Sequence, residues 1–69
     1  MSELIFEELL EQRDSYLNTL KHLNFQLMMD PSKKEIGEIE IMQEEIIQQL
    51  KKIEQELAYF YRINHIRLQ

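Results

Sequence analysis

Apolar residues in the first half of the chain recur at steps of three and four positions. They are Phe6, Leu9, Leu10, Tyr16, Leu17, Leu20, Leu23 and Leu27, with Arg13 interrupting the series. Residues at this spacing lie on one face of an α-helix, so the pattern predicts a helix from about residue 3 to residue 28. The guanidinium of Arg13 is expected either to reach past the edge of this face into solvent or to pair with a carboxylate such as that of Glu54.

A second apolar series, with nearly heptad spacing, fills the other half of the chain. It comprises Ile36, Ile39, Met42, Ile46, Leu50, Ile53, Leu57 and Phe60. Heptad spacing is typical of a helix that packs along its whole length against another helix. The pattern therefore predicts a second helix from about residue 32 to residue 66.

The two predicted helices are separated by Asp30-Pro31-Ser32, which predicts a turn at about residues 29–32. Proline disfavours a helical conformation in the residue before it and fits the first turn of a helix that follows. Either Asp30 or Ser32 can be the N-cap of the second helix, and Ser32 with Glu35 matches a capping box. Gly37, just inside this helix, is expected to allow a close approach of the backbone near the bend.

Folding the chain at this turn gives an all-α fold, a two-helix antiparallel coiled-coil-like hairpin that forms a single domain over residues 1–69. The expected register places Leu27 near Ile36, Leu20 near Gln43, Arg13 near Leu50 and Phe6 near Leu57. In this register the second helix projects about eight residues, or roughly 12 Å, beyond the start of the first helix. No other part of the hairpin is expected to cover that projection.

The projecting end of the second helix is the principal candidate for a partner-binding site. Its apolar residues are Tyr59, Phe60, Tyr61, Ile63, Ile66 and Leu68. Among them Tyr59, Ile63 and Ile66 recur at steps of four and three, which places them on a face turned away from the other helix. An uncovered apolar surface of this kind predicts binding to a partner protein or to a second copy of the chain.

A second, smaller candidate for partner binding lies near the bend. Phe25 and Met29 are one helical turn apart and lie off the main apolar series of the first helix. They either form an exposed apolar patch or simply pack over the loop. This site is therefore secondary to the C-terminal one.

Length and charge narrow the classes of partner. A chain of 69 residues without cysteine has a thin core and no disulfide, so a homodimer or a protein complex is expected. The net charge of −5 argues against a nucleic-acid partner, because binding phosphates needs clustered Lys and Arg. No apolar run reaches the roughly 18 residues of a membrane span, and Ser2-Glu3 rather than a basic segment follows Met1. The expected location is cytoplasmic.

Candidate catalytic and metal-binding residues lack the arrangement that their chemistry needs. The expected hairpin places His22 and His65 near opposite ends, so they cannot share a metal ion. Carboxylates near the start of the second helix are spread around it, without a nucleophile or a glycine-rich loop. They are Glu35, Glu38, Glu40, Glu44 and Glu45. The sequence therefore predicts no metal, no cofactor and no enzymatic activity.

Residues 46–65 read IIQQLKKIEQELAYFYRINH, an aliphatic helix that ends in an aromatic, arginine-containing tail. This segment resembles the second helix of the small helical-hairpin co-chaperones of type III secretion needle subunits in Gram-negative bacteria, and the similarity of plan covers most of the chain. The resemblance implies a cytoplasmic protein that pairs with a second, larger chaperone. Together they would keep a needle subunit unpolymerised before its export.

Two other functions stay open. One is a homodimeric coiled-coil regulator or inhibitor, of a kind that a phage could encode, which binds another protein. The other comes from similarity to the small hairpin aspartyl-phosphate phosphatases of sporulating bacteria, whose second helix carries a Ser-Gln-Glu-Leu-Asp signature. The nearest stretches here are residues 42–46 (MQEEI) and 54–58 (EQELA), and both lack the aspartate. That difference argues against phosphatase activity.

Overall fold

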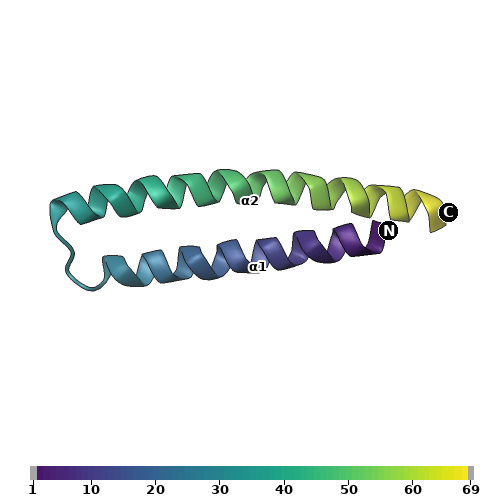
Figure 1. The fold of residues 1–69 in the computed structure, drawn as a ribbon. Coiled ribbons are helices and arrows are strands. Elements are labelled where there is room, and N and C mark those ends of the chain that lie inside the picture. Colours follow the sequence, from purple (N-terminus) through teal and green to yellow (C-terminus); the bar gives the residue numbers. More distant parts are fainter. Residues whose placement is uncertain (1, 69) are drawn as a thin grey trace.

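The computed structural model describes the backbone of residues 2–68 and the side chains of residues 3–63. Two helices, α1 (Ser2–Leu27) and α2 (Lys33–Leu68), run antiparallel as a hairpin (Figure 1), which confirms the predicted all-α fold. The hairpin is a rod of 54 × 16 × 15 Å with a Cα radius of gyration of 16.0 Å. A compact chain of this length would have a radius of gyration of about 11 Å. Most residues of the rod therefore lie close to its surface.

The end of α1 is closed by backbone hydrogen bonds that continue into the link. The amides of Met28 and Met29 donate to the carbonyl oxygens of Phe25 and Gln26 at 3.0 and 3.1 Å. Asp30 then adopts a positive φ of 56°, a left-handed conformation that Asp tolerates better than most residues. α1 itself ends at Leu27, and Asp30 turns the chain into the link one residue before Pro31.

Ser32 is the N-cap of α2. Its Oγ accepts a hydrogen bond from the amide of Glu35 at 3.2 Å and donates one to Glu35 Oε1, also at 3.2 Å. The amide of Ile36 donates to the carbonyl oxygen of Ser32 at 2.9 Å. Of the two candidates that the sequence left open, Asp30 and Ser32, the structure therefore selects Ser32.

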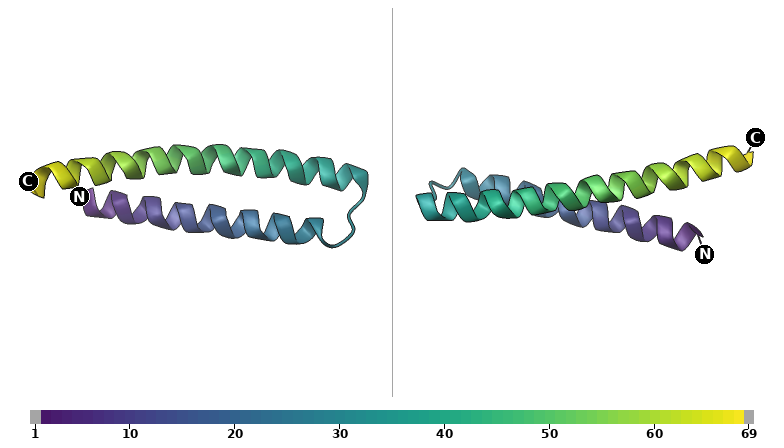
Figure 2. Two further views of the ribbon diagram at one scale, coloured as in Figure 1. Left: turned by 180° about the vertical axis from the view of Figure 1, so that it is seen from behind. Right: turned by 90° about the horizontal axis from the view of Figure 1, so that it is seen from above.

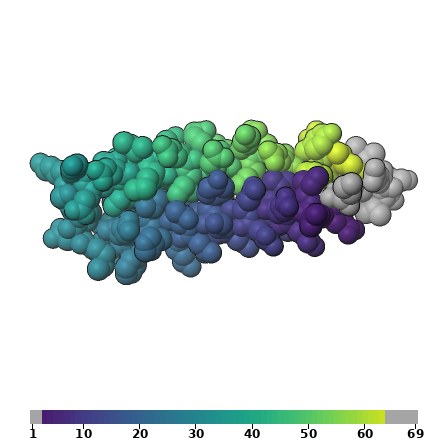
Figure 3. All heavy atoms as spheres, viewed as in Figure 1, coloured from purple at the N-terminus to yellow at the C-terminus, as the bar shows by residue number. Residues whose placement is uncertain are grey.

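The seam between α1 and α2 follows steps of three and four residues on both helices. Among the described side chains, the most deeply buried are Leu9, Leu23, Ile39, Ile53 and Leu57. Half-buried apolar residues continue the series: Phe6, Tyr16, Leu20, Leu27, Ile36, Ile46, Leu50 and Phe60. This alternation keeps one face of each helix in contact with the other along the rod, and on the face drawn in Figure 3 their side chains meet along its length.

Gln43, and not Met42, occupies the seam of α2. Gln43 is half-buried, and its Nε2 donates to Asn24 Oδ1 at 2.6 Å, whereas Met42 is exposed. The expectation that Met42 belongs to the buried series was wrong, because the heptad step that follows Ile39 spans four residues rather than three. A polar pair therefore lies at the edge of an otherwise apolar contact.

The register differs from the expected one by about one helical turn. Arg13 Nε donates to Glu54 Oε1 at 3.0 Å, whereas the expected register places Arg13 beside Leu50. In the same way, Gln43 bonds to Asn24 instead of lying beside Leu20. The expectation assumed a tight bend, but the link leads outward, and α2 begins beyond the last turn of α1 (Figure 1). As a result, α2 projects about one turn less beyond the start of α1 than the sequence predicts.

The buried seam makes a prediction about stability. Ile53 and Ile41 lie on the same helix but are 5% and 62% exposed. Ile53→Ala should lower the free energy of unfolding by about 2–4 kcal/mol, because it leaves a cavity between the helices. The matched change Ile41→Ala should alter it by less than about 0.5 kcal/mol. Urea unfolding followed by circular dichroism measures both values. Equal losses of unfolding free energy in the two variants would contradict the burial of Ile53 between the helices.

Gly37 makes a second prediction. A Cβ added there would meet no atom of the described chain within 4 Å, apart from the immediate helical neighbourhood, so the expected close approach of the backbone was wrong. Gly37→Ala should therefore raise the free energy of unfolding by up to about 1 kcal/mol, because Ala loses less backbone entropy on entering a helix. A lower melting temperature than that of the wild type would contradict this interpretation.

Candidate functional site

Large apolar side chains remain exposed over much of the hairpin. They include Leu4, Ile5, Leu17, Phe25, Met28, Met29, Ile41, Met42, Ile47, Tyr59 and Tyr61. The solvent-accessible surface is 6064 Å² for a mass of 8.5 kDa. A compact monomer of this mass would expose roughly 4,650 Å², a difference of about 1,400 Å². Since each partner in a standard interface buries about 800 Å², the surplus is large enough for one or more protein contacts.

The structure divides the predicted C-terminal site between the seam and its two sides. Phe60 packs against the buried cluster of Leu9, Ile53 and Leu57, so it belongs to the core. Tyr59 is 64% exposed, and its ring meets Phe60 edge-to-face, with centroids 6.2 Å apart and planes at 77°. A helix turns by roughly 200° over two residues, so Tyr61 lies on the other side of α2 from Tyr59.

Three residues of this predicted site remain: Ile63, Ile66 and Leu68. Ile63 is half-buried, one turn after Tyr59 and on the same side of α2. The side chains of Ile66 and Leu68 lie outside the described residues. Together with the exposed Arg62, Tyr59 and Ile63 define what we call the tail surface, on the outer side of α2.

A hollow opens beside the seam at the end of the rod where the two termini meet. It has a volume of about 430 Å³ and is lined by Phe6, Leu10, Arg13, Glu54, Leu57, Ala58 and Tyr61. The view from above in Figure 2 shows that α1 and α2 cross and then separate toward this end. The separation leaves Tyr61 72% exposed beside the buried Leu57. The sequence pattern did not predict this hollow, although Leu10, directly after Leu9, and Tyr61, directly after Phe60, are a signal for it.

The ion pair of Arg13 and Glu54 forms part of the wall of this hollow. The two side chains are partly exposed, at 43% and 56%. Ion pairs in such surroundings contribute only about 0.2–1 kcal/mol, because water and salt screen them. Both expectations for Arg13 are therefore met, since its guanidinium reaches the edge of the seam and pairs there with Glu54.

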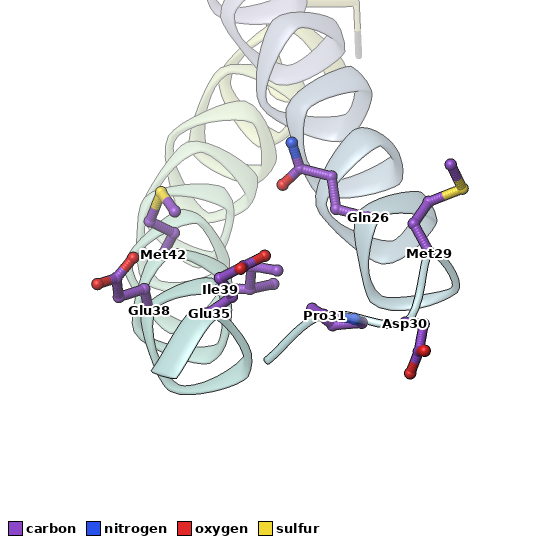
Figure 4. Close-up of a pocket in the computed structure, with 8 residues that line it drawn as sticks. All are labelled: Gln26, Met29, Asp30, Pro31, Glu35, Glu38, Ile39 and Met42. Carbon is purple, nitrogen blue, oxygen red and sulfur yellow. The ribbon is translucent and has the colours of Figure 1, made fainter. Parts of the chain in front are cut away.

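The bend carries a second hollow, of about 310 Å³. Figure 4 shows its lining residues: Gln26, Met29, Asp30, Pro31, Glu35, Glu38, Ile39 and Met42. Of the secondary predicted pair, Met29 lines this hollow and Phe25 does not, although both side chains are exposed. The two residues thus leave apolar surface uncovered at the bend.

The histidines and carboxylates of the described part of the chain are the candidates for metal binding. No group of three or more His, Cys, Asp or Glu residues there is placed to hold a metal ion. His22 is exposed, and its Nε2 lies 3.3 Å from Gln26 Nε2. The side chain of His65 falls outside the described residues. What the described surface offers is apolar side chains in position to pack against another protein.

Two further findings bear on identity. Within residues 2–68, neither helix combines the length and hydropathy needed to cross a bilayer. No family model matches the chain, and neither the curated proteins nor the solved structures give a match. The function is therefore inferred from the hairpin itself.

Proposed function

We propose that the chain is a non-enzymatic protein-binding module that packs exposed apolar side chains of its hairpin against another protein. The observation that carries this proposal is the surplus of accessible surface, 6064 Å² against roughly 4,650 Å² for a compact monomer of the same mass. Part of this surface is formed by large apolar side chains, and exposed patches of such side chains are typical of interaction sites. A rod with a thin core also gains stability when a partner covers part of it.

The tail surface is the best candidate for the contact with a different protein. Tyr59 and Arg62 are exposed there, beside the half-buried Ile63. Tyr and Arg are enriched among residues that dominate binding energy, because each combines a large contact area with a polar group. The edge-to-face contact with Phe60 also holds the ring of Tyr59 against the hairpin, so less side-chain entropy is lost on binding.

No catalytic role is part of this proposal. The glutamates in the first half of α2 are exposed, and Glu44 Oε1 accepts a hydrogen bond from Gln48 at 3.1 Å. A solvated carboxylate of this kind has no neighbouring group to hold a substrate in place for acid–base chemistry. These residues are better understood as the polar surface that keeps the rod hydrated.

The proposal is tested by comparing two double variants. Tyr59→Ala with Arg62→Ala should weaken binding to a partner isolated from the native cell extract by about 2 kcal/mol, or roughly thirtyfold. Gln12→Ala with Gln49→Ala, on the side of the rod away from Tyr61, should leave the affinity unchanged. Titration calorimetry measures the affinities, and circular dichroism checks that helicity is retained. If both variants bind the partner with the affinity of the wild type, the tail surface is not the binding site.

A narrower proposal names the partners as a second, larger chaperone and a type III secretion needle subunit. It rests on the resemblance carried by residues 46–65. The solvent-exposed Tyr59 and Arg62 within that segment support it, because they are available for contact.

This narrower proposal predicts that co-expression with such a chaperone and a needle subunit yields a soluble complex of three proteins. Light scattering coupled to gel filtration measures its mass, and electron microscopy detects needle filaments. The variant Tyr59→Ala with Arg62→Ala is expected to release the needle subunit, which then polymerises. Filaments that form equally with and without the wild-type chain would refute the co-chaperone function while leaving other protein partners open to the broader proposal.

A further inference from the structure

The two sides of the seam differ in chemistry. One side, the apolar flank, is formed by residues seven positions apart on each helix: Leu10, Leu17 and Asn24 on α1, and Glu40, Ile47, Glu54 and Tyr61 on α2. The opposite side, the polar flank, has a hollow lined largely by polar residues: Gln12, Ser15, Gln49, Lys52 and Glu56, with Tyr16 and Ile53 at its base. At mid-length, apolar side chains beside the seam are therefore concentrated on one flank. The polar flank carries Ile5 and Met42, in the rows of Gln12 and Gln49, only toward its two ends.

Two polar contacts lie on either side of the middle of the apolar flank. The ion pair of Arg13 and Glu54 lies toward the terminal end, and the hydrogen bond from Gln43 to Asn24 lies toward the bend. Residues seven apart occupy equivalent positions along a coiled-coil helix, so Leu17 falls between Leu10 and Asn24. Ile47 is related to Glu54 in the same way. Leu17 and Ile47 are 42% and 36% exposed, which leaves the centre of the flank uncovered.

On each helix, an acidic residue lies on one side of this centre and a basic residue on the other. A second hairpin that runs in the opposite direction would place its basic residue against the acidic one. Asp14 and Lys21 follow Leu10 and Leu17 by one turn, and their midpoint lies beside Leu17. Glu44 and Lys51 form a second acidic and basic pair on α2, and their midpoint lies beside Ile47. All four side chains are exposed, and none forms an ion pair with another residue whose side chain is described.

We propose that the apolar flank is the interface of a homodimer, in which two hairpins pack antiparallel about a two-fold axis near Leu17 and Ile47. In this packing, the N-terminal end of each helix lies beside the C-terminal end of the same helix in the second copy. The packing therefore brings Asp14 opposite Lys21 of the second copy, and Glu44 opposite Lys51 of the second copy. Leu17 and Ile47 of both copies then cover one another at the centre of a four-helix bundle.

Charge and area favour a second copy as the occupant. The chain carries a net charge of −5, which by itself opposes self-association. The central part of the apolar flank is closer to balance, with four acidic residues (Asp14, Glu40, Glu44 and Glu54) and three basic residues (Arg13, Lys21 and Lys51). Over the whole rod, the surface beyond that of a compact monomer is about 1,400 Å², which is more than the roughly 800 Å² that each copy contributes to a standard dimer interface.

The dimer rests on the proposal that the hairpin binds protein, but it uses a different surface. Tyr59 lies on the side of α2 away from Tyr61, and therefore away from the apolar flank. The tail surface stays free in the dimer to bind a different protein. Loss of one contact can thus be measured without loss of the other.

A charge exchange tests the dimer. Sedimentation equilibrium of the purified wild type should give twice the 8.5 kDa mass of the chain. Asp14→Lys and Lys21→Asp should each weaken the dimer by about fivefold, since each replaces two screened attractions with repulsions. The double exchange should restore wild-type affinity while keeping the net charge at −5.

The single variants also provide an internal control, because they change the net charge in opposite directions. If only overall repulsion mattered, Asp14→Lys would strengthen the dimer and Lys21→Asp would weaken it. That result, or a failure of the double exchange to restore affinity, would overturn the antiparallel arrangement. A monomeric wild type at micromolar concentration would overturn the dimer itself.

Cross-linking locates the interface independently. The chain has no cysteine, so one can be introduced at a single chosen position. Leu17→Cys, next to the proposed axis, should give a disulfide-linked dimer on mild oxidation, whereas Thr19→Cys, at nearly the same height on the polar flank, should not. Equal yields would overturn the choice of flank.

These outcomes also separate the dimer from the proposed function. A monomeric chain whose partner affinity still depends on Tyr59 and Arg62 would overturn only the dimer. A stable dimer that binds no other protein would overturn only the binding role of the tail surface.

Discussion

Two helices can bury only the faces that they turn toward each other, and this geometric limit governs the whole hairpin. Leu9, Leu23, Ile39, Ile53 and Leu57 take up the buried positions, in a single row between α1 and α2. A third layer of structure would be needed to cover the outer faces, and the described chain contains none. Exposed apolar residues therefore follow from the architecture itself, and covering them is the most direct role for a partner.

Polar residues at the seam select the register of the two helices but add little to the stability of the hairpin. An apolar row with regular spacing packs almost equally well after a shift of one heptad, so it specifies register poorly. Arg13 with Glu54 and Gln43 with Asn24 each form only in one alignment. Both pairs lie at the exposed edge, where their energies are small. Their contribution is to make other registers less favourable, at little cost to the seam.

The polar residues at the edge of the seam also border the surface that is proposed for self-association. Arg13 and Glu54 help to line the hollow beside Leu10 and Tyr61. The proposed dimer pairs opposite charges along this flank, which would offset the repulsion between two acidic chains. The tail surface faces another direction and is available to a different protein. A hairpin with one flank for its own copy and one surface for another protein can act as a symmetric adaptor.

Local features of the fold were determined by the sequence itself. Helical periodicity, the break at Asp30-Pro31 and the Ser32–Glu35 capping box depend on residues within a few positions of one another, so the all-α hairpin was predictable. Exposure of Tyr59 also followed from its place off the heptad series. The tertiary structure alone decided the register, the placement of Gln43 rather than Met42 in the seam, and the hollow lined by both helices. These depend on the path of the link and on contacts between distant residues, which no local pattern encodes.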